Sequence, residues 1–440
     1  MSRSGLVAAF VLLATPAAQA YWELQPLLQS GISFEDNPRY ISNKSAAEAI
    51  NPGITDDLLG TYVDARVTGL YETPSNKFSL TPEIRKSDYL KSDELNTDDW
   101  NVAMSADHTG NRGGVGLDGS YRENSLRNSQ FESAIPDNPN SPKPIDGGSG
   151  RFSTDTQKVW ELRPNLTYVL SPRNSLRLDS SFAASTYNQQ LVAPGGRYFD
   201  YHYSSTDLSV QQTLDAKNRL ILTLNGGRFT TEQPESVLQN STDSFGIKAG
   251  YDHTFSKTLG GTASVGVSRS STTTSGIPAG LDPVTGSPCS LATRCTSKNE
   301  GRNFVGDISL KKRSELTNFN LSLERSIAPT SNGREVVQDQ LRLYMDHRLT
   351  GKLSGSLGGL LTKESSLFSA QTALGSEIQE RVKRTYFTIG ATVSWRLTET
   401  LSASGSYNYI SEDNGSTGNS RVANNQLSVG IVFQPVGLRP

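Results

Sequence analysis

The architecture is easiest to see in one stretch of the sequence, Phe387-Thr388-Ile389-Gly390-Ala391-Thr392-Val393-Ser394-Trp395-Arg396-Leu397. Apolar residues occupy the odd positions, and polar or small residues occupy the even ones. Because successive side chains of a β-strand point to opposite faces, this period of two predicts a strand with one apolar and one polar face. The short turn Thr398-Glu399-Thr400 follows, and Leu401 to Tyr409 alternates in the same way. These residues therefore predict a β-hairpin with two chemically different faces.

The same unit recurs from about residue 58 to the end of the chain. Each repeat has an alternating segment, a short polar turn, a second alternating segment and then a longer irregular connection. Such turns are typical of tight hairpins. The short turns are 73–76, 110–113, 171–174, 215–218, 256–258, 314–317, 350–352 and 398–400.

The longer connections are rich in Pro, Gly, Asn and Ser, and one additional strand lies before the repeats and one after them, at Glu23–Asn37 and Asn425–Phe433. The count of about 18 strands is even, which puts both termini and every short turn on one side. The sequence therefore predicts an all-β fold, a closed antiparallel transmembrane β-barrel with short periplasmic turns and long extracellular loops. The long connections are 91–98, 126–155, 190–200, 231–240, 273–299, 329–334, 366–379 and 413–423.

The first twenty residues have the parts of a secretory signal: Arg3, the apolar stretch from Leu6 to Ala14, and Ala18-Gln19-Ala20 as a cleavage site. We expect residues 1–20 to be a signal peptide and residues 21–440 to form the barrel domain. The expected location is the bacterial outer membrane, reached through the inner membrane by a cleaved signal peptide.

Hydrophobic residues make up 35% of the chain, which is low for a globular core of this size. A barrel with a hydrated lumen needs only one apolar face, so it fits this composition. A soluble β-sandwich also alternates, but its loops would not separate into a short set and a long set. The net charge of −2 does not support nucleic-acid binding.

Charged residues of both signs fall on the face opposite the apolar positions, where they are expected to line the lumen. Opposite charges on neighbouring strands would brace the wall as ion pairs, and the same wall would let a polar solute pass without sticking. A strong preference for small anions would need a wall dominated by Arg and Lys, and these residues show no such excess. The lumen-lining candidates are Asp64, Arg66, Glu83, Arg85, Glu161, Arg163, Arg177, Asp179, Lys248, Asp252, Arg342, Asp346, Arg348, Arg384 and Arg396.

Neither a metal, a cofactor nor catalysis is predicted. Cys289 and Cys295 lie in one long connection and are candidates for a disulfide. The four histidines are scattered without ligand spacing. His253 and His347 each follow an Asp, but neighbours on a strand point to opposite faces, so neither pair forms a catalytic dyad. The protein is therefore expected not to be an enzyme.

Several short motifs resemble the β-barrel porins that occur with exopolysaccharide synthesis and export clusters in Gram-negative bacteria. They are Gly31 to Pro38, Tyr71-x-Thr73-Pro74, Phe78-x-Leu80-x-Pro82 and Asp98-Asp99-Trp100. The resemblance implies an outer-membrane porin that exports a secreted polysaccharide together with a periplasmic polysaccharide-export protein. The last strand, Gln426 to Phe433, is similar to the terminal signal of such barrels, although a tail from Gln434 to Pro440 follows it.

Two other functions remain compatible with these residues: a general diffusion porin for small polar solutes, and a surface scaffold or adhesin that transports nothing. The expected partners are outer-membrane lipid, a polysaccharide or small polar solute, and the periplasmic export protein. For a sugar substrate, Tyr187 and Tyr344 are expected to offer aromatic surfaces for stacking.

Overall fold

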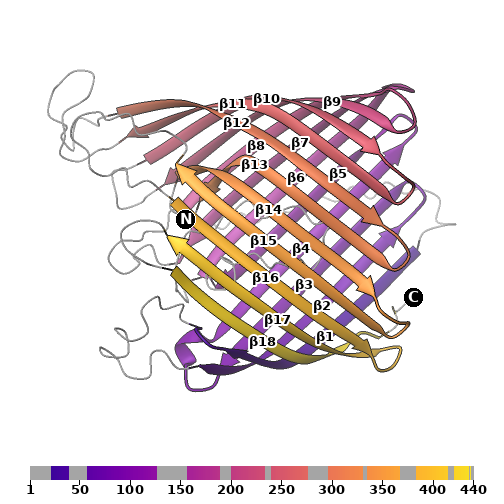
Figure 1. The fold of residues 1–440 in the computed structure, drawn as a ribbon, viewed down its shortest axis with the longest axis vertical. Helices are drawn as coiled ribbons and strands as arrows, with labels where there is room; N and C mark the ends of the chain where they lie inside the picture. Colours follow the sequence, from indigo (N-terminus) through magenta and orange to yellow (C-terminus); the bar gives the residue numbers. More distant parts are fainter. Residues whose placement is uncertain are drawn as a thin grey trace, which may run out of the picture.

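The protein is a closed barrel of 18 antiparallel strands, as the alternation predicted (Figure 1). The computed structural model describes residues 21–38, 57–125, 156–188, 200–232, 239–275, 296–330, 334–366, 383–414, 421–435 and 437. Each strand pairs with its neighbours in the sequence, and β1 pairs with β18 to close the sheet. The expected signal peptide, the two cysteines and most of the long connections lie outside the described residues.

The strands follow one another with a single short 3-10 helix, η2, between β3 and β4 in the described part of the chain. Their bounds are β1 Tyr21–Glu35, β2 Leu58–Glu72, β3 Asn76–Tyr89, η2 Asp93–Leu95, β4 Thr97–Gly110, β5 Gly113–Ser125, β6 Thr156–Ser171, β7 Asn174–Tyr187, β8 Asp200–Thr213, β9 Asn218–Glu232, β10 Gln239–Thr254, β11 Leu259–Ser275, β12 Thr296–Arg313, β13 Thr317–Thr330, β14 Arg334–Arg348, β15 Leu353–Ser366, β16 Lys383–Arg396, β17 Leu401–Asn414 and β18 Arg421–Phe433.

The outer face of the barrel is apolar because it carries the alternating hydrophobic residues. On β16, Ile389, Val393 and Trp395 are 38, 50 and 55% exposed, whereas Thr388, on the opposite face, is 2% exposed. Large apolar side chains exposed on every wall would be unfavourable in water, but they match the lipid-facing band of a membrane barrel. Within the described residues, no helix has both the length and the apolar character to cross a bilayer.

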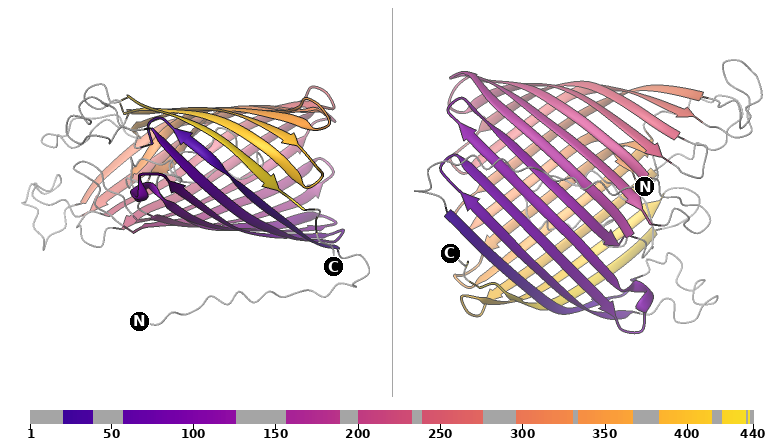
Figure 2. Two further views of the ribbon diagram at one scale, coloured as in Figure 1. Left: turned by 90° about the horizontal axis from the view of Figure 1, so that it is seen from below. Right: turned by 180° about the vertical axis from the view of Figure 1, so that it is seen from behind.

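The two ends of the barrel differ in their connections. The short turns, such as Asp215 to Asn218, all lie at one edge, which we call the turn end, and the other edge is the loop end (Figure 2). The strands nearest the termini begin and end at the turn end, since Tyr21 pairs with Glu72 and Phe433 pairs with Leu401. In bacterial barrels, short turns face the periplasm.

One turn shows how the hairpins are fixed. The Asn218 side chain donates a hydrogen bond to Asp215 Oδ2 at 2.6 Å, and the Lys217 backbone N–H donates to Asp215 Oδ1 at 2.7 Å. These donors stabilise the ionised carboxylate and lower the pKa of Asp215 below its ordinary value. Such local bonds explain why Asp and Asn occupy this turn.

Some strand ends differ from the prediction. The connection expected at 273–299 is shorter than predicted, because β11 and β12 extend into this range and Ser275 pairs with Thr296. These strand ends are built of polar residues, so they lack the apolar alternation that marked the rest. The first strand starts earlier, at Tyr21, and β18 also starts earlier, at Arg421.

The seam between β1 and β18 is a short ladder. It runs from the pair Leu28 and Phe433 to the pair Glu35 and Gln426, so the turn-end part of β1 has no partner in β18. By the alternation of the ladder, Pro26 and Pro435 occupy the next hydrogen-bonding position. Neither proline has a backbone N–H, which explains why the ladder ends there.

Candidate functional site

The candidate site is the inner wall of the barrel, formed by the strand positions that alternate with the exposed apolar ones. All of the charged residues predicted to line the lumen occupy such inward positions. Register brings two predicted pairs directly opposite each other: Asp64 faces Arg85, and Arg66 faces Glu83. Their part in conduction is still a prediction, but the inner wall carries polar and charged residues on every side of the barrel.

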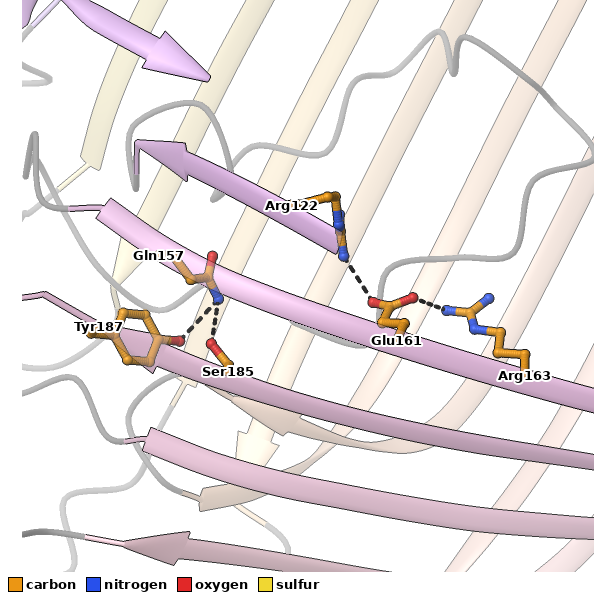
Figure 3. Close-up of polar contacts among 6 residues, drawn as sticks. All are labelled: Arg122, Gln157, Glu161, Arg163, Ser185 and Tyr187. Carbon is orange, nitrogen blue, oxygen red and sulfur yellow. Dashed lines mark hydrogen bonds and ion pairs between the residues drawn. The ribbon is translucent and has the colours of Figure 1, made fainter. Parts of the chain in front are cut away.

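Near the loop end, one carboxylate joins two arginines, of which only Arg163 was predicted from the sequence. Glu161 on β6 accepts from Arg122 Nη2 at 2.8 Å and from Arg163 Nη2 at 2.9 Å (Figure 3). Glu161 is 9% exposed. A carboxylate removed from water in this way needs charged donors on both oxygens. Closer to the loop end on the same strand, the Gln157 amide donates hydrogen bonds to both the Ser185 and Tyr187 hydroxyls (Figure 3).

A second cluster lies on the facing wall, across β15, β16 and β17. Arg384 Nε is 3.2 Å from Glu412 Oε1, and Arg384 Nη1 is 3.9 Å from Glu364 Oε2. All three residues are buried, with exposed fractions of 7% or less. The burial of three charges is tolerable because the central guanidinium joins both carboxylates.

A third network ties the seam together at the loop end. Glu35, which is 2% exposed, accepts from the Tyr89 hydroxyl at 2.7 Å and from Asn424 Nδ2 at 3.1 Å. Asn425, next along β18, donates through its backbone and its side chain to Asp36. This is the strand end that carries the Glu-Asp-Asn motif. The motif therefore fastens the first strand to the last one.

Glycines allow the seam to close around a tyrosine. Gly31 and Gly430 are opposite each other in the ladder. A Cβ atom on Gly430 would lie 2.6 Å from the Tyr62 hydroxyl, and one on Gly31 would lie 2.8 Å from it. Only glycine leaves room for the Tyr62 side chain at this place, where Tyr62 Oη accepts from Gln29 and its ring lies beside Arg85.

The turn-end half of the wall is more open. Arg219 contacts Asp252 on the adjacent strand at 2.5 Å, and Arg177 contacts Asp179 on its own strand at 2.7 Å. Both arginine side chains are 44% exposed or more. Hydroxyl pairs such as Ser406 with Ser428 fill much of the wall between the charges.

The loop-end half, in contrast, includes inward apolar residues. Leu360, Tyr386, Ile410 and Val422 form one buried cluster on four adjacent strands. The two tyrosines expected to offer stacking surfaces are also buried, Tyr187 at 6% and Tyr344 at 8% exposure. Their rings are therefore part of the packed wall and are not free platforms for a sugar.

Sequence reasoning missed several residues that complete these clusters. Each missed residue lies at an inward position, so the alternation of the sequence could have assigned it to the lumen face. Its contacts depend on the register between strands, which the sequence does not show. The missed residues are Glu35, Arg122, Arg219, Glu364 and Glu412.

The histidines stand apart from the polar wall. His108, His202, His253 and His347 all occupy positions on the outward face of their strands. Asp252 turns inward to Arg219, while His253 contacts Asn218. In the part of the chain that the structure describes, no three His, Cys, Asp or Glu residues gather as metal ligands would.

The comparisons with known proteins assign this chain to no family. No protein-family model matches the chain, and no curated protein matches it. Among solved structures, the copper transporter OprC aligns over 96% of this chain and 73% of its own, at 10% identity and a TM-score of 0.45. OccK2 (OpdF) of Pseudomonas aeruginosa aligns over 94% and 98%, at 10% identity and a TM-score of 0.40.

The outer membrane receptor FauA of Bordetella pertussis aligns over 93% of this chain and 76% of its own, at 10% identity and a TM-score of 0.39. Likeness at this level assigns neither a substrate nor a direction of transport. The closed sheet of 18 strands, its apolar outer face and its single edge of short turns identify a transmembrane β-barrel of the bacterial outer-membrane type.

Proposed function

We propose that the protein is a passive outer-membrane channel for polar solutes. The observation that carries this proposal is the inner wall of an 18-stranded barrel, whose turn-end half is mostly polar and includes exposed charges such as Arg177 and Arg219. Barrels of this strand number leave space for an aqueous channel. A wall of Ser, Thr, Asn and paired charges suits a hydrated solute.

Within that function, we propose a secreted exopolysaccharide as the substrate, delivered by a periplasmic export protein. Support comes from the resemblance carried by the Gly31 to Pro38 and Asp98-Asp99-Trp100 motifs, and from a wall whose hydroxyl and amide groups can bond to sugars. A small-solute diffusion porin uses the same wall and is the alternative. Because Tyr187 and Tyr344 are buried, neither ring is available to stack on a sugar.

The channel itself is tested with purified protein in a planar lipid bilayer. Stepwise, ohmic conductance in KCl is expected, and liposomes containing the protein should swell in neutral sugars. If neither conductance nor swelling occurs, the protein is not an open channel and the scaffold or adhesin alternative takes its place.

The substrate is tested by deleting the gene in its native host and measuring extracellular and periplasmic polysaccharide separately. Export predicts that polymer disappears from the medium while precursor accumulates in the cell. Unchanged secretion with an intact conductance would reject the polysaccharide and favour the diffusion porin.

A further inference from the structure

Three basic residues stand out at the turn end of the inner wall because no acid holds them. Lys311 on β12, Arg348 on β14 and Arg396 on β16 occupy inward positions and are exposed. Among the residues that the structure describes, no ion pair joins any of the three to a carboxylate. We call these three residues the basic arc.

The arc contrasts with several other inward arginines. Arg163 is bonded to Glu161, Arg219 to Asp252 and Arg384 to Glu364 and Glu412. The charge of each of those guanidinium groups is compensated by a carboxylate of the wall. The three cations of the arc have no such carboxylate, so their charge is available to attract an anionic solute.

Register shows how the three residues are spaced along one wall. Arg348 lies opposite Ser354, which lies opposite Ser394, two residues from Arg396. Since neighbouring strands are ~4.8 Å apart, Arg348 and Arg396, on alternate strands, are on the order of 10 Å apart across the sheet. Lys311 lies opposite Asn320, which lies opposite Tyr344, so Lys311 is level with a position four residues from Arg348. A polymer that moves along this wall would meet the three cations one after another.

The surroundings of the arc contain charges of both signs. Lys352 and Arg313 are two further basic residues at the same end of these strands, and Arg396 N–H bonds to the Lys352 carbonyl. The acids nearby are Asp346, which accepts from Ser356 at 2.9 Å, and Glu315 and Glu399 in the turns.

Acidic residues are more frequent on other strands of the same mouth. Strands β1 to β4 carry Glu23, Glu72 and Asp107 at inward positions near the turn end, together with Lys77, which pairs with Glu72 at 2.7 Å. Strands β14 to β16 and strands β3 and β4 lie on opposite walls of the barrel (Figures 1 and 2). Basic and acidic side chains are therefore concentrated on different strands of the turn-end mouth.

Between the basic residues, the neighbouring strands present small polar groups. The inner face carries Asn318 and Asn320 on β13, Ser354 and Ser356 on β15, and Ser402 on β17. An Arg fork binds a carboxylate in a bidentate manner, and amides and hydroxyls bond to sugar hydroxyls. The two together fit a saccharide that carries acid groups.

We propose that the basic arc selects acidic saccharides at the turn-end mouth of the barrel. This inference rests on the proposed channel function and narrows its substrate to an anionic class. A neutral sugar would pass the same mouth without engaging Lys311, Arg348 or Arg396.

The first test is ion selectivity of the full-length protein in a planar bilayer with a KCl gradient. The wild type is expected to prefer chloride, and K311Q/R348Q/R396Q should lower the chloride-to-potassium permeability ratio about fivefold, because each lost charge is exposed on the wall that faces the passing ions. The charge-preserving variant R348K/R396K should retain most of the preference.

The matched control removes the same formal charge from turns at the same end, with R112Q/R173Q/K217Q. A small change in this control supports the arc, whereas an equal change shows that net charge at the mouth decides selectivity and overturns it. A wild type that conducts without anion preference also overturns the arc but leaves the channel function intact. A wild type that does not conduct rejects the channel function itself.

The second test uses saccharide probes. Oligogalacturonate should block the current through the wild type, more strongly from the turn-end side, and the block should be lost in K311Q/R348Q/R396Q. Maltooligosaccharide of equal length should block both proteins alike. Equal block of wild type and variant by oligogalacturonate would contradict the proposal.

Discussion

Arg384 and Arg396 are on the same face of the same strand, β16, yet the two arginines have opposite environments. Arg384, near the loop end, is 7% exposed and contacts Glu364 and Glu412. Arg396, at the turn end, is exposed, and within the described residues no carboxylate pairs with it. The difference shows that the inward face of one strand has a structural half and an open half.

The physical reason for the difference is the cost of burying charge. A guanidinium that is removed from water must be paired, because an isolated buried charge is strongly unfavourable. A guanidinium in a hydrated mouth meets no such requirement, and its field remains available to a solute. Buried pairs such as Glu161 with Arg122 and Arg163 thus brace the wall, while the exposed arginine is suited to selection.

The largest effect is expected from breaking the buried triad. Arg384→Gln leaves Glu364 and Glu412 buried without a cation, and the free energy of unfolding should fall by about 3 to 5 kcal/mol. Urea titration of the refolded protein in lipid measures it. The matched control is Arg396→Gln on the same strand, which should leave stability unchanged, and equal losses in both variants would refute the distinction between the two halves.

The seam offers the next test, since closure also depends on buried contacts. In Gly430→Ala the new methyl group would meet the Tyr62 hydroxyl at 2.6 Å and the Ser30 carbonyl at 2.7 Å. The expected loss is about 1 to 3 kcal/mol, measured as a lower unfolding midpoint.

The control for this seam variant is Gly405→Ala on β17, where the nearest atom to a Cβ is 3.9 Å away. Combining Gly430→Ala with Tyr62→Phe removes one of the two close contacts and should restore part of the stability. A seam variant as stable as the control would show that the glycine pair does not limit closure.

A smaller effect is expected from an ion pair in the open half. Arg219 and Asp252 are paired at 2.5 Å, but their side chains are 44 and 21% exposed. Arg219→Gln should cost less than about 1 kcal/mol, because water and salt screen an exposed pair. Urea titration at low and high salt checks this, and a loss that persists in high salt would show that the pair behaves like a buried one.

The smallest effect concerns pH and the turn at Asp215. Hydrogen bonds from Asn218 and from the Lys217 N–H lower the pKa of Asp215 in the folded protein. The stabilisation is therefore present above the unfolded pKa, which is about 4, and is lost as pH falls through the lower folded pKa. The stability difference between the wild type and Asp215→Ala should shrink below pH ~4, and a difference that does not vary with pH would contradict this origin.

Much of the fold was predictable because its signals are local. Alternation in Phe387 to Leu397 marks a strand and its two faces, and turns such as Asp215 to Asn218 mark the hairpins. The number of strands and the sorting of connections followed from these elements. The polar ends of β11 and β12 were missed because they lack apolar alternation.

The site was predictable only in part. Alternation assigned inward positions to charged residues such as Arg163 and Arg384, but it could not show their partners. Glu161 with Arg122, and Arg384 with Glu364 and Glu412, depend on the register of separate strands. The position of Glu35 beside Asn424 depends on the closure of a sheet whose first and last strands are far apart in sequence.

By itself, the sequence determined which residues form strands, which side of each strand is apolar and that the barrel has an even number of strands, because those features depend on neighbours within a few positions. Only the tertiary structure decided that Lys311, Arg348 and Arg396 share one wall, that Glu23 and Asp107 lie on other strands of the same mouth, and that the mixed charges of the sequence are unevenly distributed. Register and closure set these distances, and the energy of a charge depends on its distance to other charges and to water.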